Sequence, residues 1–261
     1  MNSCHNKYYM TDINMTKSTV LEVKNLKKSY PGLHTIEDIS LELGKKQFVS
    51  ILGPSGCGKS TLFNIISGLE IPDKGRVIID DKNYNGRTGR VSYMHQKDLL
   101  FPWTSIINNV CLPLFIKGEN KNNSHIRAKK YFRDFGLEGF EDKYPNQLSG
   151  GMRQRAALLR TYLFANDIML LDEPFGNLDA ITRRKMQLWL LEILEKINAS
   201  VLFITHDIDE ALFLSDRIYL LSKRPAVIMK VFDIDIKRPH DNRIFTTPEF
   251  NKLKEEIITL L

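Results

Sequence analysis

The residues with the clearest chemistry form a glycine-rich loop between an apolar run and an amphipathic segment. In order they are Gly53, Pro54, Ser55, Gly56, Cys57, Gly58, Lys59 and Ser60, followed by Thr61. Glycines let backbone N–H groups turn inward around phosphate oxygens, and the N-terminus of a following helix adds partial positive charge. Lys59 is expected to reach the terminal phosphates of a nucleotide, and the Ser60 hydroxyl to bind Mg²⁺. The spacing predicts a P-loop, because a chance glycine turn would not need the strand before it and the helix after it.

Later in the chain, a pair of carboxylates directly follows a run of four apolar residues. Asp172 and Glu173 come directly after residues 168–171, as acidic groups at the end of a buried strand would. Alone, such a pair is often no more than a strand end. With a P-loop upstream, Asp172 is expected to hold the magnesium and Glu173 to polarise the attacking water. The two segments together predict the two halves of an ATPase site.

Three further segments have a structural explanation as well as a chemical one. Ser149, Gly150 and Gly151 open a predicted helix, which Ser149 could simply cap. Capping does not explain the paired glycines, whose exposed N–H groups could approach a phosphate closely. His206 follows a predicted strand, where a lone histidine is usually structural. Tyr30 could stack on an adenine ring.

These segments occur in the order found in the ATP-binding subunits of ABC transporters, which the chain resembles from about residue 20 to about residue 225. The Leu-Ser-Gly-Gly sequence at residues 148–151 is the most specific of them. The resemblance implies a head-to-tail homodimer that encloses two ATP molecules. In that dimer Ser149 and Gly151 contact the γ-phosphate held by the other copy, and His206 orients water together with Glu173.

The same resemblance implies roles for three more residues. Gln96 is similar to the Q-loop glutamine, an additional contact to Mg²⁺ and water. Asp179 is similar to the D-loop residue that crosses the dimer interface, and Tyr30 to the aromatic residue that stacks on adenine. Asn177 stands where the family more often has Ala or Ser, a departure that removes no catalytic group.

The elements that must position these residues are strands joined by helices. Strands are expected over residues 20–24, 36–43, 47–52, 75–80, 90–95, 168–172, 201–205, 218–221 and 226–232. Helices are expected over residues 60–69, 105–118, 124–136, 149–164, 180–198 and 248–261. Strand–helix–strand units with apolar strands favour a mainly parallel sheet. The resemblance implies an α/β P-loop NTPase core of this kind, with an antiparallel β lobe and an inserted helical signature subdomain.

The same pattern predicts the organisation of the chain. Residues 1–19 are expected to be a disordered N-terminal tail, in which Met10 or Met15 could be the true start. The resemblance implies an ABC ATPase domain over residues 20–225, with its helical subdomain expected at about 99–165. Residues 226–261 are expected to form a short C-terminal extension without the regulatory β domain of sugar-importer ATPases.

Composition limits where the chain works and what it binds. No apolar run approaches the ~18 residues that a membrane-spanning helix needs, and the start lacks the apolar middle of a secretory signal. We therefore expect a cytoplasmic protein. The formal net charge is +6 without an aromatic and basic stripe, so no nucleic-acid partner is expected. Three widely spaced cysteines suggest neither a disulfide framework nor a zinc site.

An apolar and aromatic stretch follows Gln96. Leu99, Leu100, Phe101, Pro102 and Trp103 could be the core of the helical subdomain, or a groove that accepts a short helix of a membrane permease. Together with Met-Arg-Gln-Arg at residues 152–155, this stretch resembles the nitrate, sulfonate and taurine branch of bacterial importers. The branch implies a peripheral subunit on the cytoplasmic face of the membrane. Its partners would be permease subunits, contacted near residues 99–103, and an extracytoplasmic solute-binding protein.

Other functions remain open at this point. An exporter or a lipoprotein-release ATPase would share every motif. A soluble ABC ATPase acting on DNA or ribosomes would carry long coiled-coil insertions or a second cassette, which the sequence lacks. A P-loop kinase of a small metabolite has no use for the Leu-Ser-Gly-Gly sequence or for His206. Within the importer branch, nitrate, sulfonates, taurine and pyrimidine precursors of thiamine all fit as cargo.

Overall fold

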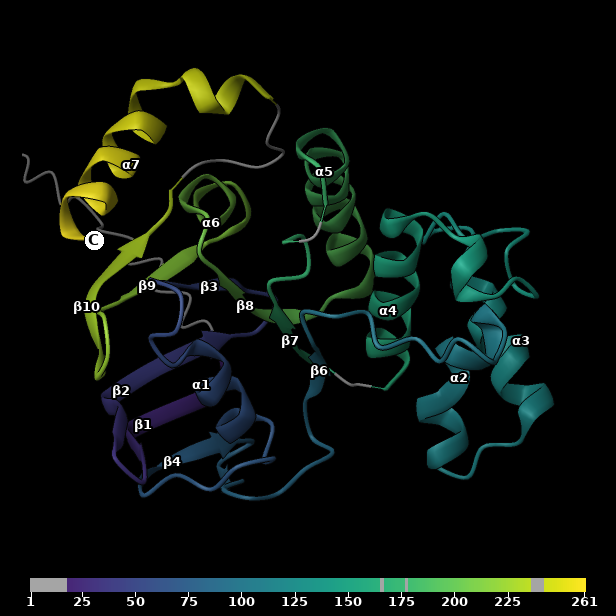
Figure 1. Ribbon diagram of the computed structural model, residues 1–261, viewed down its shortest axis with the longest axis horizontal. Helices are drawn as coiled ribbons and strands as arrows, with labels where there is room; N and C mark the ends of the chain where they lie inside the picture. Colours follow the sequence, from purple (N-terminus) through teal and green to yellow (C-terminus); the bar gives the residue numbers. More distant parts are fainter. Residues whose placement is uncertain (1–17, 165–166, 177, 236–241) are drawn as a thin grey trace, which may run out of the picture.

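One mixed sheet of ten strands organises the described residues of this computed structural model, which are 18–164, 167–176, 178–235 and 242–261. Across the sheet the order is β5-β4-β1-β2-β10-β9-β3-β8-β7-β6 (Figure 1). The strands are β1 (Thr19–Tyr30), β2 (Leu33–Gly44), β3 (Phe48–Leu52), β4 (Lys74–Ile79), β5 (Lys82–Asn83), β6 (Ser92–Met94), β7 (Ile168–Asp172), β8 (Ser200–Thr205), β9 (Arg217–Leu221) and β10 (Ala226–Asp233).

Five of these strands form the parallel core that the sequence predicted. β9, β3, β8, β7 and β6 pair in parallel, and every residue of β3, β7 and β8 is buried. Along β7, Met169 and Leu171 join one apolar core, while Ile168 and Leu170 join a second core on the opposite face. A strand covered on both faces reads as an unbroken apolar run, which explains why this segment shows no alternation.

An antiparallel lobe forms the other end of the sheet, as the resemblance implied. β1 pairs with β2 and β4, and β4 with β5, all antiparallel. Helix α1 (Lys59–Ile66), which follows the glycine loop, packs Leu62 and Phe63 into the same core as Leu21 and Val23 of β1. The phosphate loop therefore starts a helix that the lobe holds in place (Figure 1).

A backbone irregularity explains why β1 is longer than the predicted strand over residues 20–24. Leu21, Val23 and Leu26 are all buried, so the alternation of buried and exposed side chains shifts by one residue between Val23 and Leu26. Asn25 lies at this shift with a φ of 47°, a left-handed conformation typical of a bulge. The alternation stops at the bulge, although the strand continues to Tyr30.

The helical part of the chain lies at the far end from the lobe (Figure 1). It contains α2 (Ile106–Ile116), α3 (Lys121–Phe132) and α4 (Gly150–Phe164), and α2 packs against both of the others. Helix α5 (Ala180–Ile197) connects β7 to β8. Within the described residues, no helix is long and apolar enough to cross a membrane.

Some short elements were not predicted. They are β5, α6 (Ile208–Leu214), and the 3₁₀ turns at Pro145–Gln147 and Asn242–Thr246, the second of which leads into α7 (Pro248–Leu260). Each is shorter than a window in which periodicity can be recognised. The predicted tail lies outside the described residues except for Ser18 and Thr19, and Thr19 already belongs to β1. Asn177 also lies outside them.

Candidate nucleotide site

The glycine loop connects the end of β3 to the start of α1 and leaves little room for side chains. Gly56 and Gly58 have φ values of 75° and 122°, which other residues rarely adopt. A Cβ atom on Gly58 would also lie 3.0 Å from Cγ2 of Thr35. Cys57 is buried, and burial raises the pKa of its thiol, so this cysteine acts as a small apolar side chain rather than a redox group.

A cavity of about 390 Å³ opens beside this loop. Its lining includes nine of the residues predicted to bind or hydrolyse ATP: Tyr30, Ser55, Gly56, Gly58, Lys59, Ser60, Thr61, Gln96 and Glu173. Lys59 is buried, and its ammonium group donates hydrogen bonds to the carbonyl oxygens of Gly53 (2.8 Å) and Pro54 (2.9 Å). The structure thus gathers these residues from four separate segments near the carboxyl end of the parallel strands, where α/β sheets bind ligands.

Two polar side chains contact the same carboxylate oxygen of Glu173 beside the cavity. Gln96 donates from Nε2 to Oε2 of Glu173 at 3.2 Å, and Nδ1 of His206 lies 3.1 Å from the same oxygen. They follow the parallel strands β6, β7 and β8, which are neighbours in the sheet. The backbone of Glu173 has a φ of 44°, a strained conformation that costs about 1–3 kcal/mol. Such strain is typical of functional positions, and the contacts of the carboxylate with Gln96 and His206 help to hold it.

Asp172 lies one residue earlier and is buried. Tyr93 donates a hydrogen bond from its hydroxyl to Oδ2 of Asp172 at 3.1 Å. Burial raises the pKa of Asp172, and hydrogen bonds from Tyr93 and Ser60 oppose that rise. Burial and the adjacent Asp172 raise the pKa of Tyr93, so that the phenol remains a neutral donor. The side chains of Ser60 and Asp172 therefore meet at the base of the phosphate loop.

Tyr30 lies at the other end of the cavity, at the end of β1. Its hydroxyl donates to Oε2 of Glu70 at 2.5 Å, and the ammonium of Lys28 lies 5.3 Å from the centre of its ring. The ring is thus fixed by partners outside the cavity, which is suitable for stacking on a planar base.

The signature residues and Asp179 do not line this cavity. Ser149 caps α4, accepting a hydrogen bond from the backbone N–H of Met152 at 3.3 Å. Oδ1 of Asp179 caps α5, accepting from the N–H groups of Ile181 and Thr182. A Cβ on Gly151 would lie 3.3 Å from Cγ2 of Thr182, so close packing of the two helix starts also favours glycine there. These residues form one surface at the N-termini of α4 and α5.

Some residues of the cavity were not predicted. Leu33, Thr35 and Arg224 line the cavity, and Tyr93 donates a hydrogen bond to Asp172. Arg224 reaches the loop because β9 pairs with β3 in parallel, so the turn after β9 lies beside the glycines. Its Nη2 atom is 3.2 Å from the position that a Cβ on Gly56 would take. No local motif marks these residues, since only strand pairing brings them to the site.

Comparisons with known proteins indicate the family of the chain. The family described as ABC transporter matches residues 36–176. A formylaminopyrimidine import ATP-binding protein of Halalkalibacterium halodurans is 42% identical over 87% of this chain and 89% of its own length. A taurine import ATP-binding protein of Pseudomonas aeruginosa is 40% identical over 85% of this chain and 87% of its own length.

The fold also matches a solved structure, a bacterial ABC transporter cassette in its dimeric form. The TM-score is 0.72 and the identity 32%, over 83% of this chain and all of that one (100%). The family match covers more than half of the sequence, and the relatives match along most of it. This chain therefore belongs to the ABC transporter family, in which it is an ATP-binding cassette ATPase.

Proposed function

We propose that this chain is the ATP-hydrolysing subunit of a bacterial importer, with a sulfonate, taurine, nitrate or pyrimidine-type solute as cargo. The observation that carries the ATPase assignment is the meeting of Gln96, Glu173 and His206 at one oxygen beside the glycine-loop cavity. The names of the relatives favour import over export or a soluble role, because they include taurine and formylaminopyrimidine import proteins.

Each group at the site has a distinct task in this proposal. The backbone N–H groups of the glycine loop and the ammonium of Lys59 bind the phosphates, and Tyr30 stacks on the base. Glu173 accepts a proton from the attacking water, and Gln96 and His206 hold that carboxylate and the water in position. Phosphoryl transfer to water depends mostly on positioning and charge neutralisation, so a fixed carboxylate is well suited to it.

The residues at the base of the loop fit a magnesium ion. Ser60 and Asp172 present oxygen atoms close to each other, and Gln96 offers a further amide oxygen nearby. In the part of the chain that the structure describes, no group of three His, Cys, Asp or Glu side chains could hold a metal alone. Mg²⁺ usually takes one or two protein oxygens together with substrate phosphates, which is what these residues allow. When bound, the ion would neutralise charge on the phosphates.

A second copy of the chain completes the site in this proposal. At the start of α4, Ser149 is exposed and Gly150 and Gly151 are half-exposed, and none of them lines the cavity of its own chain. In a head-to-tail dimer these helix N-termini contact the γ-phosphate held by the partner, and Asp179 crosses the interface close by. The likeness to a dimeric cassette supports this arrangement.

The loop after Gln96 is the proposed contact with the permease. Phe101 and Trp103 stack with ring centres 5.0 Å apart, and Trp103 is 73% exposed. Leu100 is buried, so the alternative explanation of this stretch as subdomain core holds for that residue. The side-chain amide of the buried Asn109 fixes the loop. It accepts a hydrogen bond from the N–H of Phe101 at 2.6 Å and donates one to the carbonyl oxygen of Phe101 at 3.0 Å. An exposed aromatic pair on a fixed loop is typical of an interface anchor.

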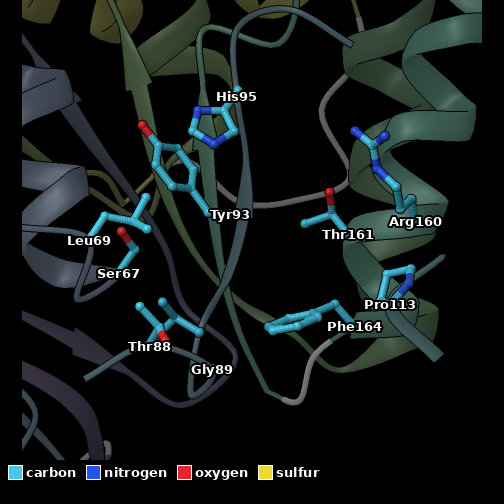
Figure 2. Close-up of a pocket in the computed structure, with 11 residues that line it drawn as sticks. Ser67, Leu69, Thr88, Gly89, Tyr93, His95, Pro113, Arg160, Thr161 and Phe164 are labelled. Carbon is cyan, nitrogen blue, oxygen red and sulfur yellow. The ribbon is translucent and has the colours of Figure 1, made fainter. Parts of the chain in front are cut away.

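A mainly apolar cavity of about 240 Å³ extends this surface (Figure 2). Figure 2 shows Tyr93 of the edge strand β6, and His95 just after it, facing Thr161 and Phe164 of α4 across it. Arg160 joins the cavity to the aromatic loop, because it lines the cavity and donates to the carbonyl of Leu99 at 2.7 Å. We therefore place a short apolar permease segment across both, which would hold the chain on the cytoplasmic face of the membrane.

Co-purification tests the transport assignment. The tagged Glu173→Gln chain, solubilised from membranes of its own host in detergent and ATP, is expected to bring down a multi-span permease. An extracytoplasmic binding protein in the same sample would support import and identify the cargo. Recovery of ribosomes, DNA or no partner would contradict the transport assignment while leaving the ATPase assignment intact.

The permease contact makes a separate prediction. Trp103→Ala in the same tagged chain is expected to abolish recovery of the permease, because truncating a central aromatic anchor costs about 2–4 kcal/mol of binding. In a chain that keeps Glu173, Trp103→Ala should not change the ATPase activity of the isolated protein. Ile126→Ala is the matched control, since Ile126 is 62% exposed on α3 of the same helical part. Equal permease recovery with Trp103→Ala and Ile126→Ala would remove this loop from the interface.

Arg224 is expected to strengthen nucleotide binding. Its guanidinium lines the cavity beside Gly56, where a positive charge favours phosphate. Arg224→Ala should weaken ADP binding by about 10-fold to 150-fold, because charge-assisted hydrogen bonds contribute about 1.5–3 kcal/mol. Lys223→Ala removes an exposed cation from the same turn and should leave binding unchanged. Isothermal titration with ADP and with adenosine separates a phosphate contact, which affects only ADP, from a contact to the base.

A further inference from the structure

Helix α6 begins at Ile208, two residues after His206, so whatever fixes α6 also fixes the histidine. Asp207 caps this helix, accepting from the backbone N–H of Glu210 at 3.1 Å. The hydroxyl of Thr205, at the end of β8, accepts from the N–H of Asp207 at 3.0 Å and donates to the carboxylate of Glu210. His206 therefore lies in a short segment between the strand end and the first turn of α6.

Helix α6 cannot hold this position by itself. It spans only Ile208–Leu214, about two turns, and isolated helices of that length are unstable in water. Its orientation must come from the elements packed against it. On one side these are the sheet and α5, where Gln187 donates to Glu210 at 3.0 Å. On another side is the C-terminal segment of residues 242–261 (Figure 1).

The C-terminal segment contacts both turns of α6. In the first turn, Oδ1 of Asp209 lies 2.6 Å from the ammonium of Lys254 on α7. In the second turn, the buried ring of Phe213 stacks on Phe245 with centres 5.5 Å apart, and Phe245 meets the buried Phe250 edge-on at 4.9 Å.

A cation from α5 joins the same contact. The guanidinium of Arg184 lies 3.7 Å from the ring centre of Phe213 and 3.9 Å from that of Phe245. Both distances are within the range of cation–π attraction, so Arg184 links α5, α6 and the C-terminal segment at one point. The segment is thereby fixed to the same helix that starts at Asp179.

We propose that residues 242–261 form a brace that positions His206 against Glu173 through α6, with Lys254 and Phe245 as the positioning residues. The brace gives the extension beyond the ATPase domain a role in hydrolysis without any contact to nucleotide. This inference rests on the proposed role of His206 in the site. The simpler explanation, that α7 only covers the apolar core, predicts that its ion pair with Asp209 has no effect on turnover.

The ion pair offers a test that leaves the fold intact. A partly exposed pair contributes little to stability, so Lys254→Glu should fold with a near-normal melting temperature. Its kcat for ATP is expected to fall about tenfold, since small misplacements of a positioned group reduce rates strongly. The KM for ATP should stay within about twofold, because the glycine loop is untouched. Lys252→Glu makes the same charge change at an exposed position of α7 and should alter neither value.

A rescue and a direct signal distinguish positioning from general damage. Asp209→Lys combined with Lys254→Glu restores the pair in reverse and should recover most of the lost kcat. The imidazole NMR signals of His206, assigned with His206→Ala, should shift in Lys254→Glu and return in the reversed pair. Unshifted His206 signals together with wild-type kcat in Lys254→Glu would overturn the brace. Full turnover in His206→Ala would instead overturn the proposed role of His206.

Discussion

Glu173→Gln is expected to reduce ATP turnover about 100-fold to 10,000-fold, the range that a general base contributes. The carboxamide is nearly the same size as the carboxylate and can still accept from Gln96, so the local geometry should persist. It cannot accept a proton from the attacking water. ATP binding should be unchanged, because the glycine loop and Tyr30 provide it and neither contact involves Glu173. Phosphate release under steady-state conditions measures the loss.

The control for this variant lies on α5. Glu192→Gln makes the same chemical change at an exposed position and should leave turnover intact. The glutamine variant is preferable to an alanine because the strained backbone of Glu173 is held partly by its side-chain contacts. Steady-state turnover equal to that of the unaltered chain would remove Glu173 from the role of base.

The slow variant should also accumulate the ATP-bound dimer. If hydrolysis opens the dimer, a chain that binds ATP without cleaving it should elute as a dimer with ATP and as a monomer with ADP. This behaviour would tie the site in one chain to the helix N-termini of the other. It also provides the background in which the signature surface can be tested.

The local parts of the site were predictable because each is a short motif with its own physical requirement. The glycine loop requires positive φ values at Gly56 and Gly58, and the sequence shows that requirement directly. Asp172 ends a buried strand, which an unbroken apolar run also shows. The parallel core followed from the apolar strand–helix–strand pattern and the antiparallel lobe from the family resemblance, and both are confirmed.

What the sequence could not show depends on contacts between distant segments. Arg224 lies beside the glycines only because β9 pairs with β3, and Tyr93 meets Asp172 only because β6 pairs with β7. The second half of β1 was not predicted, because the bulge at Asn25 interrupts the alternation of apolar and polar residues. Phe213 packs on Phe245, and these residues belong to a short helix and a turn that are too short to show a recognisable periodicity in the sequence.

The paired glycines show why a structural and a functional explanation can both be correct. Gly151 packs against Thr182 at the start of α5, where a Cβ would be tight, and Ser149 caps α4. Neither contact requires a ligand. Yet Asp179 caps the start of α5 close to the start of α4, and the first N–H groups of a helix have no partner within the helix. Separating the two roles requires a change that preserves the cap and alters only what the surface attracts.

Ser149→Asp is such a change, and it is expected to reduce turnover about 100-fold. Aspartate is as good an N-cap as serine, so α4 should keep its start and the chain its stability. In the proposed dimer, however, the new carboxylate would face the γ-phosphate of the partner, and juxtaposed like charges cost several kcal/mol. Binding of ATP to the single chain should remain, because Ser149 does not line the cavity of its own subunit.

Ser149→Asn is the matched control, since it has the same shape and capping ability without the charge. In the Glu173→Gln background, the asparagine variant should still form the ATP-dependent dimer and the aspartate variant should remain monomeric. High salt should partly rescue the aspartate variant if repulsion is the cause, because ionic strength screens it. Equal dimerisation of the two variants would mean that Ser149 only caps α4. The contact of the partner with the γ-phosphate would then have to come from other residues. A monomeric aspartate variant that still binds ATP would place the negative charge of the partner's nucleotide directly against the start of this helix.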